Sequence, residues 1–162
     1  MADKPPEARM AECIAKYSPE VRTVAEAALK KMRARLPGAV ETVYDNYNAL
    51  AIAFGPTDRR SDVVCSITLY PRWVSLFFAR GAGLLDPQKL LKGTGTTVRH
   101  IVLEDVSVLD RSAVRALVTQ AVTAAGARFD KATARQVVIK SVAKTRRPRR
   151  PAAARRSTRR VP

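Results

Sequence analysis

Apolar residues recur at the three- and four-residue spacing of an amphipathic helix in two parts of the chain. The first part follows Ser18 and Pro19, a pair that typically begins a helix, and ends at Pro37. The second follows Asp110, which we expect to cap its first turn, and ends near Ala125. The apolar positions are Val21, Val24, Ala28, Met32 and Leu36 in the first part and Val114, Leu117, Val118 and Ala121 in the second. The pattern therefore predicts two helices, one on each side of a central region.

The central region contains short apolar runs of the length and composition of β-strands. The predicted strands span residues 40–44, 49–54, 63–69, 73–79 and 98–104. Short connections between them favour antiparallel hairpins over parallel crossovers. Asp86-Pro87 predicts a brief helix through Leu91, and a run at 137–139 fits a strand or a helix equally well. The expected fold is α+β, with an antiparallel sheet of about five strands covered by N- and C-terminal helices.

Aromatic side chains concentrate on the predicted strands. Trp73 and Phe77 share one face of their strand, so we expect both to pack in the core. The alternative is the stacking of RNA bases on a sheet, but the basic and aromatic signature of such sheets is missing. Cys65 lies in an apolar strand and Cys13 follows an acid, so both are expected to be inert thiols.

Positive charge is concentrated at the C-terminal end. The 162 residues include 30 Lys and Arg against 14 Asp and Glu, a net charge of +16. Residues 1–127 hold 17 basic and 13 acidic side chains, whereas residues 128–162 hold 13 basic side chains and one acid. We therefore divide the chain into an N-terminal lead with a short helix (1–17), an α+β domain (18–127), an uncertain connecting segment (128–144) and an Arg/Pro-rich segment (145–162), called the basic tail.

The basic tail has four Arg-Arg pairs, three prolines and no acid, so we expect it to be disordered. Arginine guanidinium groups bind phosphate oxygens pairwise, and each neutralised phosphate releases counterions. The arginines are Arg146, Arg147, Arg149, Arg150, Arg155, Arg156, Arg159 and Arg160. They predict contact with the phosphate backbone of DNA or RNA, without sequence preference. A solubilising terminus or an arm attracted to anionic lipid are the alternatives. Because a disordered segment contributes no packing, deleting it is expected to leave the thermal midpoint almost unchanged.

A second candidate site lies in the body, around a loop that follows a cation. Backbone N–H groups of such a loop can hold a small anionic ligand, whereas the alternative is a tight turn in which glycine supplies a positive φ. The candidate residues are Tyr70, Trp73, Lys92, Gly93, Thr94, Gly95, Arg99 and His100. The loop lacks the P-loop pattern, and His100 is the single histidine and more consistent with a structural or pocket-lining role.

Catalytic and metal-binding patterns are missing from the sequence. No nucleophile–base pair is visible, so a binding protein is favoured over an enzyme, and no cofactor is expected. Carboxylates at Asp45, Glu104, Asp105 and Asp110 have no metal-binding spacing and are expected at the surface, so no metal site is predicted. No apolar run approaches the about 18 residues that cross a bilayer, and the N-terminus lacks the apolar stretch of a secretory signal. With two distant cysteines, these features predict a cytoplasmic protein, associated with the chromosome if the tail binds DNA.

Three short motifs resemble the YdhG-like domain family. They are Asp86-Pro87, the loop Lys92-Gly93-Thr94-Gly95, and Arg99-His100 on a strand, and the resemblance spans roughly residues 17–125. It implies a small α+β fold, in agreement with the expectation above. One branch of the family is similar to a frataxin-like iron-delivery protein, so the resemblance also implies iron handling by the body as an alternative function.

Overall fold

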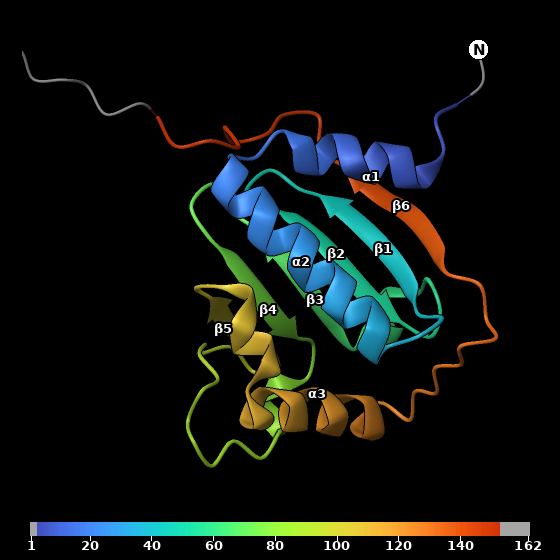
Figure 1. Ribbon diagram of the computed structural model, residues 1–162, viewed down its shortest axis with the longest axis vertical. Coiled ribbons are helices and arrows are strands. Elements are labelled where there is room, and N and C mark those ends of the chain that lie inside the picture. The colour runs from blue at the N-terminus through green and yellow to red at the C-terminus, as the bar shows by residue number, and fades with distance from the viewer. Residues whose placement is uncertain (1–2, 153–162) are drawn as a thin grey trace, which may run out of the picture.

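A six-stranded sheet with three helices forms the folded body in a computed structural model that describes residues 3–152 (Figure 1). The helices are α1 (Pro6–Ala15), α2 (Pro19–Arg35) and α3 (Ser112–Ala124). The strands are β1 (Val40–Asp45), β2 (Leu50–Gly55), β3 (Cys65–Leu69), β4 (Val74–Phe78), β5 (Arg99–Leu103) and β6 (Gln136–Val142). The expected α+β class is confirmed.

The strand order is β5-β4-β3-β2-β1-β6, and every neighbouring pair from β1 to β5 is antiparallel. β6 adds to the free edge of β1 in parallel, with Val137 opposite Glu41 and Ile139 opposite Val43. The sheet is therefore mixed and has one strand more than we predicted. The run at 137–139, which the sequence left open between strand and helix, lies in this added strand.

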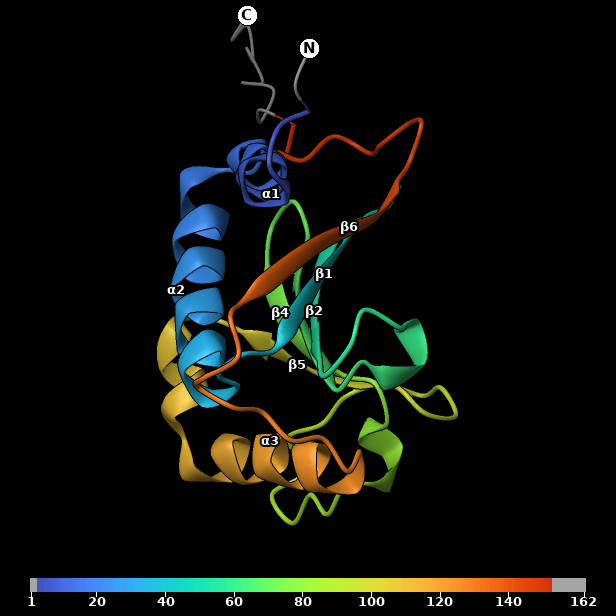
Figure 2. The same ribbon diagram turned by 90° about the vertical axis from the view of Figure 1, so that its right-hand side faces the viewer.

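Helix α2 begins and ends where the sequence indicates. The Ser18 hydroxyl accepts a hydrogen bond from the Val21 N–H at 3.4 Å, and Pro19 occupies the first turn. After the helix, Gly38 has a φ of +75°, and a Cβ there would lie 2.3 Å from the Asp130 carbonyl oxygen. Only glycine therefore allows the segment that leads into β6 to pass this closely. Figure 2 shows α2 along one face of the sheet and α3 across one end.

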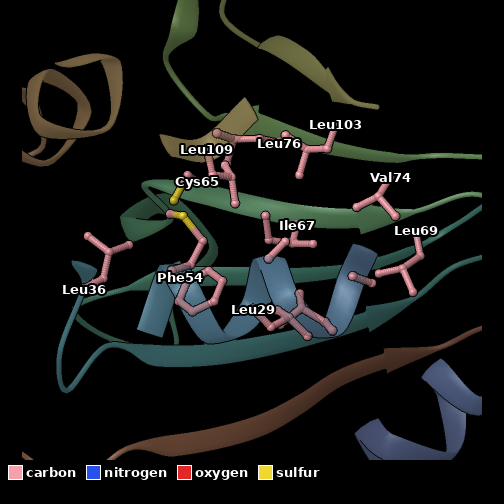
Figure 3. Close-up of a cluster of buried hydrophobic side chains, with 14 of the residues drawn as sticks. Leu29, Leu36, Phe54, Cys65, Ile67, Leu69, Val74, Leu76, Leu103 and Leu109 are labelled. Atoms are coloured by element: carbon pink, nitrogen blue, oxygen red, sulfur yellow. The ribbon is translucent and has the colours of Figure 1, made fainter. Parts of the chain in front are cut away.

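The core lies between α2 and the sheet. Figure 3 shows Leu29 of α2 close to Phe54 and Ile67, with Leu76 and Leu109 in the same cluster. Every second residue of the central strands faces these side chains, which removes most of their apolar surface from water.

Trp73 and Phe77 are not core residues, which corrects the expectation above. Strand β4 turns Val74, Leu76 and Phe78 inward, so its alternate positions face the side of the sheet away from α2. Trp73 is 43% exposed and stacks on Tyr70 with ring centroids 4.7 Å apart. The two residues do share a face, but it is the outer one.

Two predicted helix starts are also wrong. Residues around Asp86 form a turn, because the Asp86 carboxylate accepts hydrogen bonds from the Leu90 and Leu91 N–H groups at 3.0 and 2.8 Å. Asp110 does not cap α3: the residue before the helix is Arg111, which makes no side-chain cap. The Asp110 carboxylate instead binds two cations of α2.

Candidate functional site

Residues 145–152 of the basic tail lie against the body instead of extending away from it. Arg146 Nε lies 2.5 Å from Asp45 Oδ2, and Arg149 Nη2 lies 2.8 Å from Asp45 Oδ1. We call these three residues the Asp45 cluster. Asp45 is 2% exposed and Arg149 6%, so the expected surface position of Asp45 is wrong, and this part of the tail is ordered by ion pairing. The rest of the predicted disordered tail, from residue 153 on, lies outside the described residues.

The parallel addition of β6 explains why these groups meet. Asp45 is the last residue of β1, and Val142 of β6 lies opposite it. The chain that leaves β6 therefore starts beside the buried carboxylate, and only a few residues separate it from the arginines. An unpaired carboxylate at this position would carry a large desolvation cost, which two guanidinium groups offset.

Backbone carbonyls and an aromatic ring complete the surroundings of Arg149. Its guanidinium group donates to the Tyr47 carbonyl at 3.2 Å and to the Asn46 carbonyl at 2.5 Å. It also lies 5.6 Å from the centroid of the Tyr17 ring. Burial raises the pKa of Tyr17 to about 12, so the phenol stays protonated and donates to the Leu69 carbonyl at 3.1 Å. Arg149 is therefore a structural residue of the body.

The other two described arginines of the tail remain at the surface. The Arg147 side chain is exposed, and its backbone N–H donates to the Tyr47 carbonyl at 2.8 Å. Arg150 is also exposed and donates from Nε alone to the Lys16 carbonyl at 3.2 Å. The remaining predicted phosphate-binding residues lie outside the described residues: Arg155, Arg156, Arg159 and Arg160. The described tail thus divides into two anchoring and two exposed arginines.

The predicted body site divides into two places on the sheet. Lys92 and His100 form an isolated antiparallel bridge with backbone hydrogen bonds of 2.8 and 2.9 Å, and the Gly93–Gly95 loop with Thr94 lies between Lys92 and β5. His100 pairs with Phe77 at one end of β4, whereas Trp73 precedes the other end. Phe77 is four positions along the chain from Trp73, or about 13 Å at the usual rise of a strand. Tyr70 and Trp73 therefore do not share a pocket with the loop, which corrects that expectation.

The guanidinium group of Arg99, a candidate for binding an anion, instead donates hydrogen bonds to carbonyl groups of the neighbouring loop. Arg99 Nη1 donates to the Gly95 carbonyl at 2.6 Å and to the Val98 carbonyl at 2.7 Å. His100 stacks on Phe77 with ring centroids 5.0 Å apart, and burial together with the Lys92 charge lowers the pKa of His100. Two cavities in the described part of the chain are lined by other residues. This geometry favours a structural turn over an anion site.

Thiols and carboxylates in the body show no arrangement for metal binding. Burial raises the pKa of Cys65 to about 12, and burial followed by the Asp45 charge raises that of Cys13. Both thiols are therefore protonated at neutral pH. Within residues 3–152, no three His, Cys, Asp or Glu side chains come together as possible metal ligands, so these residues do not fit the iron implied by the resemblance. No helix of this part is long and apolar enough to span a bilayer.

Sequence reasoning missed a groove between the C-terminal end of α2 and α3, which contains Arg35 and Arg115. The two arginines come from helices about 80 positions apart, and no motif links them. The burial of Asp45 had a weak signal in the sequence. Residues 41, 43 and 45 alternate along β1, so Asp45 shares the inner face of the strand with the apolar Val43.

Comparison with known proteins found no match: no family model matches the chain, and no curated protein or solved structure is significantly similar to it. The resemblance to YdhG-like domains therefore stays a prediction.

Proposed function

We propose that the protein is a non-enzymatic binding protein that contacts the phosphate backbone of nucleic acid through its basic tail, without sequence preference. The observation that supports this most strongly is the charge distribution, because the last 18 residues carry eight arginines and no acid. A segment of this composition attracts polyanions at distances up to the screening length, which is about 8 Å at physiological salt concentration.

The Asp45 cluster changes how the tail would act. Two of its arginines are paired with Asp45, so the first part of the tail is anchored to the body. Six arginines are then left for phosphate, two of which, Arg147 and Arg150, are exposed in the described part. If all six contact duplex phosphates, the logarithm of the binding constant falls with the logarithm of salt concentration with a slope of about −5.

The test uses the full chain with the anchoring arginines intact. Replacing the six others, Arg147, Arg150, Arg155, Arg156, Arg159 and Arg160, by Gln should abolish most of the binding to a labelled 20-mer and reduce its salt dependence. Replacing the same six by Lys keeps the charge and should keep the salt slope. Fluorescence anisotropy over a range of salt concentrations, with duplex DNA and single-stranded RNA in parallel, measures both quantities.

If the six-Gln protein binds as tightly and with the same salt slope as the unmodified chain, the proposal is wrong. A preference for duplex DNA would support a role on the chromosome, and a preference for RNA a role in the cytoplasm. The test separates these because both nucleic acids offer the same phosphates and differ in geometry.

A further inference from the structure

The groove between α2 and α3 has the size of a small-molecule site. Its volume is about 510 Å³, and it lies where the last turn of α2 faces the middle of α3. The chain that follows α3 passes beside the end of α2 and contributes Phe129 (Figure 2). Sites for small ligands typically enclose about 300–1,000 Å³ and combine apolar walls with a few polar groups.

Two guanidinium groups make one side of this α2–α3 groove cationic. Arg35 Nη2 lies 3.1 Å from Asp110 Oδ1, but the same carboxylate also binds Lys31 Nζ at 2.8 Å. Among the described residues, Arg115 forms no ion pair. Two cations therefore share one carboxylate, and Arg115 adds a third positive charge without an acid of its own, so the local charge is positive.

One hydrogen-bond donor of Arg35 has no acceptor among the described residues. Its Nη1 is buried and has no hydrogen-bond partner within the described part of the protein. A buried guanidinium nitrogen without an acceptor is costly, and an anion or a water molecule that reaches it would remove this cost. Burial, followed by repulsion from Arg115, lowers the pKa of Arg35, and an anion between the two arginines would remove that repulsion.

Apolar side chains form the other wall. Leu36 closes the end of α2, Val122 faces the groove from α3, and Phe129 packs beside them against the core. Thr119 adds a hydroxyl on the same face of α3. An inorganic anion would use only the cationic side, whereas a ligand with an apolar body would also bury these side chains.

We propose that the α2–α3 groove binds a small amphipathic organic anion, whose carboxylate or phosphate monoester lies between Arg35 and Arg115 and whose hydrocarbon part lies against Leu36, Val122 and Phe129. Guanidinium groups bind both anions pairwise, so the two head groups share the same recognition chemistry. The C-terminal end of α2 carries a partial negative charge, which repels an anion. The positive charges of Lys31, Arg35 and Arg115 outweigh this partial charge. This inference is independent of the nucleic-acid proposal, because the groove contains no residue of the basic tail.

Four probes separate the contributions to binding: octanoate, octyl phosphate, octanol and inorganic phosphate. Isothermal titration calorimetry on the full chain, below the concentrations at which the probes aggregate, should detect binding of at least one octyl anion. Octanol and inorganic phosphate should each bind at least tenfold more weakly than the better octyl anion, since each lacks one of the two features. The better of the two octyl anions identifies the head group.

The decisive variant is Arg115→Gln, because the Arg115 side chain is exposed and its loss should leave the fold intact. It should weaken binding of the octyl anion by about tenfold or more, as expected when a hydrogen bond between charged groups is lost. The matched control is Arg111→Gln, one turn earlier and not part of the groove, which should bind like the unmodified chain.

Phe129→Ala should weaken both octyl anions while leaving any binding of inorganic phosphate unchanged. Three outcomes would each overturn the inference: no binding of either octyl anion, equal binding of octanol, or equal affinity of the Arg115→Gln protein. In the last case, the anion binds elsewhere on the cationic surface.

Discussion

The guanidinium group of Arg149 lies 2.8 Å from the carboxylate of Asp45, although 104 positions separate the two residues in the chain. Both side chains are almost completely buried. The partner of a buried acid in β1 is therefore supplied by a segment whose composition is that of a disordered tail. The first part of that segment belongs to the folded body, and its removal should affect the stability of the protein.

Replacing Arg149 by Met should lower the free energy of unfolding by about 3 kcal/mol, because a buried carboxylate is left with Arg146 alone. Urea unfolding followed by circular dichroism measures the change. Adding Asp45→Asn to this variant should recover part of the loss, since the buried charge is then removed as well. Arg147→Met is the control, and its effect should stay within about 0.5 kcal/mol because the side chain is exposed. Equal effects of the two single substitutions would contradict the structural role of Arg149.

Truncation should distinguish the anchoring part of the basic tail from the rest. A chain ending at Lys144 loses both partners of Asp45, and its thermal midpoint should fall by about 10 °C or more, as follows from a loss of at least about 3 kcal/mol in a protein of this size. A chain ending at Ala152 keeps the Asp45 cluster and should melt like the full chain. Differential scanning calorimetry measures both. This prediction replaces the expectation from the sequence that removal of the whole tail leaves the thermal midpoint unchanged. Identical midpoints for all three chains would support the earlier expectation instead.

Stability in acid should depend on Glu41. Burial raises the pKa of this carboxyl group, but hydrogen bonds and charges from Arg33 and Arg135 outweigh burial and hold the pKa below its ordinary value of 4.5. Arg33 Nη2 lies 2.8 Å from Glu41 Oε1, and Arg135 binds the other oxygen. A carboxyl group with a lowered pKa in the folded state contributes stability above its ordinary pKa and loses it as the pH falls through the lowered value.

The Glu41→Gln protein should therefore be less stable than the unmodified chain at pH 7, and the difference should shrink as the pH falls below about 4.5. Urea midpoints measured from pH 7 to pH 3 give this comparison directly. A difference that stays constant over the whole range would mean that the charge of Glu41 contributes nothing to stability.

The outer position of Trp73 predicts a small effect of its removal. Trp73→Ala loses the stack with Tyr70 and should cost about 1 kcal/mol. Phe78→Ala, on the inner face of the same strand and fully buried, should cost about 3–5 kcal/mol. Trp73 is the single tryptophan, so its fluorescence should be quenched by acrylamide in the native protein almost as strongly as in urea. Strong protection from acrylamide would place the indole in the core.

Elements set by local patterns could be predicted from the sequence. Ser18 and Pro19 begin α2 as expected, and the four strands from β2 to β5 fall inside the predicted runs or within one residue of them. In each case, the information lies within a few neighbouring residues: the cap, the period of the apolar positions and the turn that follows. Such signals do not depend on the rest of the fold.

Features that depend on distant partners could not be predicted. The alternation of β4 shows that Trp73 and Phe77 share a face, but which face is inner depends on where α2 packs. Asp110 has the residue type of a helix cap, yet Lys31 and Arg35 from another helix bind it instead. The burial of Asp45 required β6 to pair in parallel with β1, a contact that no local pattern encodes.

The position of β6 in the sheet has a consequence for how the molecule is made. The strand that fills the open edge of β1 is synthesised after every other strand and helix of the sheet layer. Until it arrives, a growing polypeptide presents an unpaired strand edge, which is the kind of surface that promotes self-association and recruits chaperones. The sheet is then completed only after Val142 has been synthesised, and a message cut short after α3 should yield insoluble material rather than a smaller stable domain, as fractionation by centrifugation would show.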